Sequence, residues 1–504
     1  MQFDVWSKAL PDLAVDCIAA GVFEDGKLGT ETTALDKATA GRIKNVVSRG
    51  DFSGRSGETL LMSEAGLKAT RVILVGLGAE RSYNRKVWRR ACTAALSAAA
   101  RTRIRSVALG IERPAAKELD DYYFGRCVAE ITGNVLYRTN DLKTGKKPPA
   151  PVINQVLAGP VRATGVAQAK QGLEHGRALA EATSLQRDLG NLPPNICTPG
   201  YLADRARGLA KRYASVKVKV LDEAAIRREK MGCFLAVTQG SAEPPRFIVL
   251  DYRGPRASRT APIVLVGKGI TFDTGGISLK DPGAMDEMKY DMMGAASVMG
   301  AIAFLAEAKL PVRVVGLVAA CENMPDGRAV KPADIVTSAS GQTVEILNTD
   351  AEGRLILADA ITRAAEDEPD RLIELSTLTG AQLVSLGTRV IGAMGEPGWR
   401  DEVVAAGTAA GEASWAMPMP DELRRGLDSS VADIKNVPTE RFGGMIVAGR
   451  FLGEFVPDGL PWVHLDIAGP AFNTGSAHDY TPVGGTGAGV RTVIAAVEGL
   501  AARS

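Results

Sequence analysis

The chain has 504 residues, of which 45% are hydrophobic and 23% charged, and its formal net charge is +2. This length exceeds that of one ordinary domain, and the composition is that of a soluble globular protein. The N-terminus lacks a basic start followed by an apolar core, and no apolar run approaches the roughly 18 residues of a spanning helix. We therefore expect two domains, a cytoplasmic location and no membrane segment.

Six cysteines occur singly along the chain, without any Cys-x-x-Cys pair. Such an arrangement is typical of reduced structural thiols. It disfavours both a disulfide framework and a thiolate-bound zinc ion.

Charge is distributed unevenly along the chain. Residues 1–165 carry 25 Lys and Arg against 17 Asp and Glu, whereas the remainder carries 35 against 41. A solvated surface is the favoured interpretation of the basic excess, and a DNA-binding surface is the alternative. The alternative depends on two basic clusters, namely Arg85, Lys86, Arg89 and Arg90, and then Arg101, Arg103 and Arg105.

In the first third of the chain, short Val, Ile and Leu runs alternate with Ala-rich stretches. The run at 71–75 and the stretch at 85–100 predict a strand and a helix of an α/β domain. The turn at 75–78 resembles part of a dinucleotide-binding loop, but Arg81 stands where that motif needs its third glycine. Another apolar run at 152–157 predicts one more strand.

A long polar-faced pattern at 161–189 predicts a helix that could connect two domains. A Gly, Asn and Pro cluster at 190–195 predicts its end. We therefore expect an N-terminal α/β domain over 1–165, a connecting helix over 166–192 and a larger domain over 193–504.

Six apolar runs in the larger domain predict buried strands, and helical patterns separate most of them. This alternation predicts an α/β fold with a central parallel or mixed sheet that is covered by helices on both faces. Ligands of open α/β sheets bind beyond the carboxyl ends of the strands, so chemistry is expected just after these runs. The runs are 216–221, 246–251, 262–267, 312–319, 371–375 and 461–467.

A glycine-rich segment with Lys268, Asp273 and Lys280 lies just beyond the run at 262–267. Glycines let the backbone approach a ligand closely, and a purely structural loop does not need three charges of mixed sign. A phosphate-binding loop is disfavoured because Gly269, rather than Ser or Thr, follows Lys268.

Further carboxylates precede two helical patterns. Asp291 stands before a pattern that runs to about residue 306, where it could be a helix-terminal charge or a ligand. Asp350 and Glu352 precede the pattern at 356–365, and they can converge only if Asp350 lies in the loop and Glu352 at the helix start. A helix cap with first-turn acids remains the alternative for that segment.

The chain has only three histidines, so a His-rich zinc site or a Ser-His dyad has little to draw on. The remaining option is an oxygen-rich site in which several carboxylates share two divalent ions. Such a pair of ions activates water and polarises a carbonyl group.

The octapeptide Asn-Thr-Asp-Ala-Glu-Gly-Arg-Leu at 348–355 closely resembles the signature of the leucyl aminopeptidase family. The segment Gly-Lys-Gly-Ile-Thr-Phe-Asp-Thr-Gly-Gly at 267–276 resembles the first metal segment of the same family. Weaker matches extend the resemblance over roughly 180–495, and over the first 160 residues it is only architectural. The resemblance implies a macro-like N-terminal domain for regulation or assembly and a zinc-exopeptidase-like catalytic domain. It also implies an aminopeptidase that releases Leu and other apolar N-terminal residues.

By the same resemblance, five residues would hold two divalent ions, zinc or manganese with magnesium or cobalt as further options. Asp273 and Glu352 would bridge the ions. Lys268 and Asp291 would complete the site that receives the substrate amine, and Asp350 would serve the other site. As a ligand Lys268 must be neutral, which an adjacent dication can enforce.

The resemblance further makes Lys280 and Arg354 catalytic without binding metal. The Lys280 ammonium would stabilise the oxyanion that forms when hydroxide attacks the peptide carbonyl. Arg354 would hold a bicarbonate that acts as general base.

A substrate pocket is implied at Met288, Thr377, Gly380 and Ala468. Independently, Thr377 and Ala468 follow the predicted strands at 371–375 and 461–467. An apolar pocket with a flexible thioether favours Leu or Met. The alternative is that these four are ordinary core residues.

Two other functions remain open at this point. A two-metal phosphoesterase would use the same carboxylates but cleave phosphate esters rather than aminoacyl amides. A DNA-binding accessory protein would retain the motif beside a secondary peptidase activity. A homohexamer with central catalytic domains is implied by the resemblance alone.

Overall fold

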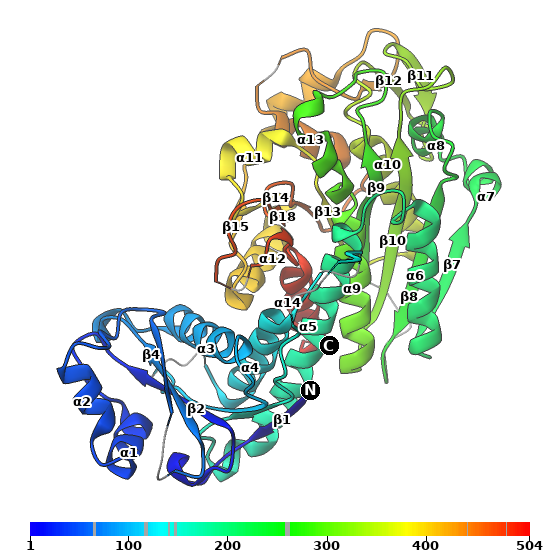
Figure 1. Cartoon of the computed structure of the whole chain (residues 1–504). Helices are drawn as coiled ribbons and strands as arrows, with labels where there is room; N and C mark the ends of the chain where they lie inside the picture. Colours follow the sequence, from blue (N-terminus) through cyan, green and yellow to red (C-terminus); the bar gives the residue numbers. More distant parts are fainter. Residues whose placement is uncertain are drawn as a thin grey trace. The chain divides into compact units, whose positions relative to one another are not determined.

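The computed structural model describes residues 1–63, 67–114, 119–139, 142–145, 149–257, 263–440, 442–479 and 481–503. The chain forms two compact units (Figure 1). The first unit contains Met1–Glu181 and Ala477–Thr481, and the second contains Ala182–Ser476 and Pro482–Ser504. The first unit thus combines the N-terminal third of the chain with a short segment from near its other end.

Six strands form the sheet of the first unit in the order β1-β6-β5-β2-β4-β3, and every neighbouring pair is parallel except β3 with β4. The predicted strand at 71–75 is confirmed as β4, whereas the run at 152–157 forms a strand only from Gln155 onward. The strands are β1 (Gln2–Val5), β2 (Cys17–Val22), β3 (Thr59–Ser63), β4 (Arg71–Gly76), β5 (Ser106–Gly110) and β6 (Gln155–Ala158).

The helix predicted at 85–100 is confirmed as α3 (Arg85–Ala100). The Asn84 side chain accepts hydrogen bonds from the N–H groups of Lys86 and Val87 and so satisfies donors left free at the helix start. The alanine-rich face of α3 is buried, because small side chains allow close packing on the sheet and on α4. The other helices of this unit are α1 (Thr30–Ala38), α2 (Arg42–Ser48) and α4 (Asp121–Leu136).

The long helix predicted at 161–189 is present as α5 (Val166–Asn191). Its first part belongs to the first unit and its last turns, from Ala182, belong to the second. Gln186 and Arg187 are fully buried in these last turns. Gln186 donates to the hydroxyl of Ser297 (2.7 Å) and Arg187 donates to the carbonyl oxygen of Thr486 (2.7 Å). The polar side chains here are therefore structural hydrogen-bond donors of the second unit.

Eight strands form the large sheet of the second unit in the order β15-β14-β17-β13-β9-β10-β8-β7. The four central strands are mutually parallel, and β8 and β14 pair with them in antiparallel fashion, so the sheet is mixed as predicted. All six predicted strands are present, and residue 262 lies outside the described residues. The strands are β7 (Val216–Leu221), β8 (Arg246–Arg253), β9 (Ile263–Asp273), β10 (Arg313–Asn323), β13 (Arg371–Ser376), β14 (Ile391–Gly395), β15 (Ser414–Ala416) and β17 (Trp462–Asp466).

Different helices cover the two faces of this sheet. Val264 and Val266 of β9 share a core with α10 (Gly353–Ala364), α8 (Gly232–Thr238) and α13 (Gly444–Gly453). On the opposite face a Cβ at Gly267 would lie 2.8 Å from Ala295 of α9 (Met293–Ala308). Adjacent strand residues point to opposite faces, so the predicted coverage of both faces is confirmed. The remaining helices are α6 (Pro199–Arg212), α7 (Glu223–Arg228), α11 (Gly380–Leu386), α12 (Pro397–Ala410) and α14 (Val490–Ala501).

Short strands escaped the sequence analysis. Besides β14 and β15, a small sheet joins β11 (Asp334–Thr337), β12 (Thr343–Ile346) and β16 (Ile434–Lys435). Among the described helices, the segment Pro282–Ala308, which joins a 3-10 helix (Pro282–Tyr290) to α9, is long and apolar enough to resemble a membrane span, but 83% of its apolar window is buried inside the fold. It is a core segment that carries Asp291.

Candidate metal centre

Strand β9 carries two of the proposed ligands. The sequence predicts a strand that ends at 267, with Lys268 and Asp273 in the loop beyond it. This boundary is wrong, because β9 continues to Asp273 and pairs with β10 over this length. A Cβ at Gly353 would lie 2.7 Å from the Nζ atom of Lys268, so the absence of a side chain at Gly353 makes room for the lysine.

The other three proposed ligands come from the starts of two helices. Asp291 precedes α9, which approaches the sheet so closely that a Cβ at Gly294 would lie 2.1 Å from the carbonyl oxygen of Leu375. Asp350 lies in the loop before α10, and Glu352 is the N-cap residue of that helix. Asp350 in the loop and Glu352 at the helix start are the positions that the sequence requires for these two carboxylates to converge.

Two lysines each contact two of the four carboxylates of the cluster. The Nζ atom of Lys268 lies 2.8 Å from Asp291 Oδ2 and 2.8 Å from Glu352 Oε1. The Nζ atom of Lys280 lies 2.8 Å from Asp273 Oδ2 and 2.5 Å from Asp350 Oδ1. Lys268 is almost fully buried, whereas 21% of the Lys280 side chain is exposed. The cluster thus has an inner lysine and a lysine at its mouth.

Burial and mutual repulsion perturb these carboxyl groups. Burial raises the pKa of Asp273 to about 6, with a further contribution from the charge of Glu352. Burial also raises the pKa of Asp291 above its usual value, against the opposing charge of Lys268. Burial lowers the pKa of Lys268, but the charges of Asp291, Glu352 and Asp273 outweigh this effect and raise it above its usual value. Four carboxylates facing two ammonium groups leave a deficit of positive charge.

The cluster fits divalent cations. Asp273, Asp350 and Glu352 each offer a ligand atom, and these three atoms lie within 4.8 Å of one another. Carboxylate oxygens bind magnesium and manganese and are accepted by zinc. A dication would also correct the deficit of positive charge, and it favours the neutral form of a coordinating amine such as Lys268.

Three buried polar residues that the sequence analysis missed hold the ligands in place. Asn323 donates to Asp273 Oδ1 (2.8 Å) and to the carbonyl oxygen of Thr349 (3.0 Å). The hydroxyl of Thr349 donates to the carbonyl oxygen of Gly275 (2.6 Å), which joins the two ligand segments. Asn436 donates to the carbonyl oxygen of Asn348 (2.7 Å). No short-range motif marks Asn323 or Asn436, and only Thr349 lies inside the octapeptide.

The two proposed catalytic residues differ in their surroundings. Burial lowers the pKa of Lys280, but Asp273, Glu352 and Asp350 raise it above its usual value, so this lysine is charged. Arg354 follows Glu352 on α10 and donates from Nη1 to the carbonyl oxygen of Asn436 (2.8 Å). Burial lowers the pKa of Arg354 to about 10, which leaves it cationic at neutral pH. Its Nε group has no hydrogen-bond acceptor among the described residues.

Of the four proposed pocket residues, Thr377 is hydrogen-bonded to the carboxylate cluster. Thr377 donates from its hydroxyl to Asp291 Oδ1 (2.7 Å), and its carbonyl oxygen accepts from Lys268 (3.2 Å). Ala468 follows β17 and is buried. Met288 is half-buried three residues before Asp291, and Gly380 is exposed at the start of α11.

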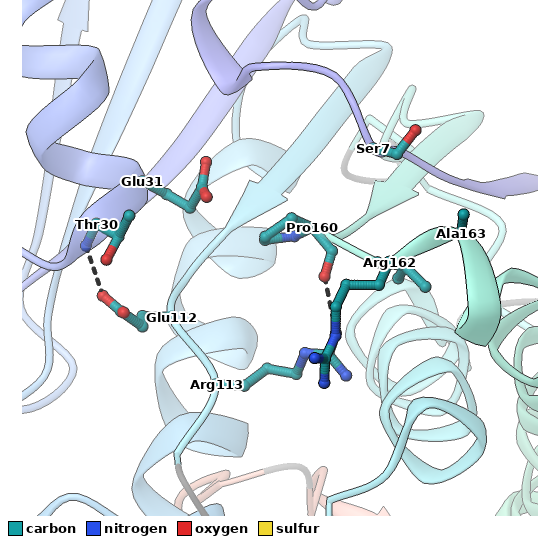
Figure 2. A pocket seen from close by; sticks show the side chains of 9 residues that line it. Ser7, Thr30, Glu31, Glu112, Arg113, Pro160, Arg162 and Ala163 are labelled. Carbon is teal, nitrogen blue, oxygen red and sulfur yellow. Dashed lines mark hydrogen bonds between the residues drawn. The ribbon is translucent and has the colours of Figure 1, made fainter.

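A cavity of about 500 Å³ lies at the carboxyl edge of the sheet in the first unit (Figure 2). Two of its four charged lining residues are held by hydrogen bonds: Glu112 accepts from the N–H of Thr30 (2.8 Å), and Arg113 donates to Asp121 (2.8 Å) and to the carbonyl oxygen of Pro160 (2.7 Å). This cavity has no carboxylate cluster of the kind found in the second unit and is not the candidate metal site.

Comparison with known proteins identifies the family. The model of the cytosol aminopeptidase family, catalytic domain, matches residues 184–494, and that of the N-terminal domain matches residues 19–146. The chain belongs to the cytosol aminopeptidase family. A cytosol aminopeptidase of Pseudomonas aeruginosa is 45% identical over 477 residues, which cover 94% of this chain and 95% of the relative. A probable cytosol aminopeptidase of Methylobacillus flagellatus is 43% identical with the same coverage.

Solved structures of related enzymes agree. A mutant of tomato leucine aminopeptidase has a TM-score of 0.87 and 32% identity, and the match covers 99% of this chain and 96% of the tomato chain. The bottromycin maturation enzyme BotP, also solved in complex with Mn, has a TM-score of 0.83 and 35% identity, with 97% of this chain and 100% of BotP covered. The α/β fold expected from the sequence is confirmed, and the protein is a metal-dependent aminopeptidase, a hydrolase that removes N-terminal residues.

Proposed function

We propose that the carboxylate cluster binds two divalent ions, zinc or manganese, and is the active site of a leucyl aminopeptidase. The observation that carries this proposal is the convergence of Asp273, Asp350 and Glu352, whose ligand atoms lie within 4.8 Å of one another. Lys268 and Asp291 complete the ligand set, and their ion pair (2.8 Å) places both at the same end of the cluster. Magnesium and cobalt are further options, because oxygen donors accept them.

When bound, the two ions supply an activated water and a polarised peptide carbonyl. The residues of the chain do the remaining work. Charged Lys280, held at the mouth of the cluster, stabilises the negative charge that develops on the carbonyl oxygen. Arg354 offers a planar cation that suits bicarbonate, which would take up the proton of the attacking water. Lys268 and Asp291 mark the end of the site that receives the free amine of the substrate.

Selectivity for the first side chain is assigned to Met288, Thr377, Gly380 and Ala468. The hydrogen bond from Thr377 to Asp291 supports a pocket beside the amine end of the site. Its apolar members and the flexible thioether of Met288 favour Leu and other apolar residues.

Further assignments concern the protein as a whole. We place it in the cytoplasm, as the names of its relatives suggest. By family resemblance it forms a homohexamer with central catalytic domains (193–504), and the chain also has a connecting helix (166–192) and a macro-like domain (1–165) for regulation or assembly.

Neither alternative function has a supporting observation in the described part of the chain. A phosphoesterase is disfavoured by the family, whose members act on peptides. For DNA binding, Arg89 is buried against Glu130 (3.1 Å) and so cannot contact a phosphate, and the exposed Arg90 pairs with Asp479 (3.0 Å).

A panel of aminoacyl amides and phosphate esters tests the proposal. Protein loaded with manganese or zinc should hydrolyse leucyl amide fastest and leave phosphate esters intact, and elemental analysis should find two ions per chain. Hydrolysis of phosphate esters without cleavage of amides would refute the proposal.

A further inference from the structure

Asp466 is a fully buried carboxylate close to the proposed pocket, and no role has been assigned to it so far. It is the last residue of β17 and lies opposite Ser376, the last residue of β13, in a parallel register. It therefore stands at the carboxyl edge of the sheet, between the loops that leave these two strands.

Both oxygen atoms of Asp466 accept hydrogen bonds from these loops. Oδ1 accepts from the N–H groups of Leu378 (3.2 Å) and Ala468 (3.1 Å). Oδ2 accepts from the hydroxyl of Thr379 (2.8 Å). One side chain thus joins the loop after β13 to the loop after β17.

A second set of hydrogen bonds connects the loop after β13 to the loop after β17. The oxygen of Thr379 caps α11 by accepting from the N–H of Gln382 (3.1 Å). Gln382 is fully buried and its Oε1 accepts from the N–H of Gly469 (2.6 Å). Asp466, Thr379 and Gln382 therefore form a chain of hydrogen bonds that returns to the residue after Ala468.

The loop that Asp466 holds touches two proposed ligands. Thr377, next to Leu378, donates to Asp291 and accepts from Lys268. A displacement of Leu378 would therefore move Thr377 relative to Lys268 and Asp291. Behind this junction, the Nδ1 atom of His464 is hydrogen-bonded to a carboxyl oxygen of Glu374, and both residues are fully buried. The hydrogen bonds of Asp466 therefore connect both loops to the end of a strand in the buried centre of the sheet.

We infer that Asp466 is a positioning residue that fixes Thr377 and Ala468 on opposite sides of the substrate side chain. This inference rests on the proposed function, because it takes these two residues as walls of the pocket. Asp466 does not touch the substrate. It sets the width of the pocket and the place of Thr377 beside the amine end of the site.

The test compares Asp466→Asn and Asp466→Ala with the unmodified enzyme in its metal-loaded form. Asn retains an oxygen for Leu378 and Ala468 but cannot accept from Thr379 with its amide nitrogen, so KM for leucyl amide should rise by about tenfold. Asp466→Ala removes all three hydrogen bonds to the loops. A resulting displacement of Thr377 by about 1 Å should lower kcat/KM for leucyl amide by about 10²-fold. Selectivity for leucyl over alanyl amide should fall in both variants, and it should fall further in Asp466→Ala than in Asp466→Asn. The metal content should stay unchanged.

Asp359→Asn is the matched control. Asp359 is also fully buried and also accepts two backbone N–H groups, those of Phe234 (2.8 Å) and Ala339 (2.7 Å). Its replacement should lower Tm without changing selectivity. Where Asp466→Ala does not fold, Asp466→Asn and Thr379→Val carry the test.

The outcomes separate this inference from the proposed function. If the unmodified enzyme cleaves leucyl amide but the Asp466 variants keep its KM and its selectivity, or change them no more than Asp359→Asn does, Asp466 is only structural. If the unmodified, metal-loaded enzyme does not cleave aminoacyl amides, the proposed function itself fails.

Discussion

Replacement of Lys280 by alanine should separate catalysis from metal binding. Its Nζ atom lies 2.8 Å from Asp273 and 2.5 Å from Asp350, so in the absence of ions it neutralises part of their charge. Bound dications would take over that role. We therefore expect Lys280→Ala to keep both ions and to lose the positive charge that stabilises the developing oxyanion.

The structure sets the size of this effect. One preorganised donor at an oxyanion is worth about 10²- to 10³-fold in kcat, or roughly 2.7 to 4 kcal/mol. Because 21% of the Lys280 side chain remains exposed, solvent screens part of its charge and favours the lower end of this range. We expect kcat for leucyl amide to fall by about 10²-fold.

The assay combines steady-state kinetics with elemental analysis of the same preparation. Lys331→Ala is the control, because Lys331 is exposed and pairs with Asp334 (3.1 Å) away from the carboxylate cluster. It should behave as the unmodified enzyme. Loss of an ion from Lys280→Ala, or a kcat within twofold of the unmodified value, would refute the assigned role.

Three other predictions follow from the cluster and its helix. Chelation should abolish hydrolysis of leucyl amide and Mn²⁺ or Zn²⁺ should restore it; full activity of demetallated protein would rule out the mechanism. Glu352→Ala should lose at least one ion by elemental analysis, because a bridging ligand serves two, and two retained ions would contradict its bridging role. Burial raises the pKa of Asp359 to about 7, whereas an unfolded Asp titrates near about 3.9, so the stability that its protonated form contributes is lost as pH rises from about 4 to about 7 and is constant above that. Tm of Asp359→Asn should therefore fall less between about pH 5 and pH 7 than Tm of the unmodified protein, and equal slopes would disprove this account.

Local patterns in the sequence predicted most of the architecture. The six apolar runs correspond to strands because buried strands need continuous Val, Ile and Leu. The end of β9 was misplaced because Gly267, Lys268 and Gly269 interrupt its apolar run, although these residues continue the strand by pairing with β10. Strands as short as β16 carry no periodic signal that could be read.

The site was predictable where its residues cluster in the sequence and obscure where they do not. The loop position of Asp350 and the helix-start position of Glu352 follow from the spacing of two carboxylates before a helix. Asn436 reaches Asn348 across 88 residues, and Asp466 reaches Leu378 across the same separation. Such partners are brought together only by the pairing of strands, and a single sequence does not reveal which strands are neighbours.

The segment Ala477–Thr481 has a consequence for the order of events during synthesis. It belongs to the first unit, yet about 300 residues separate it from Glu181. At about 5 to 20 residues per second, a ribosome needs roughly 15 to 60 s to cover that distance. Throughout this interval the newly made N-terminal unit lacks the segment Ala477–Thr481, and Arg90 cannot form its ion pair with Asp479. A fragment that stops at Glu181 would therefore lack one segment of the first unit and its ion pair with Arg90.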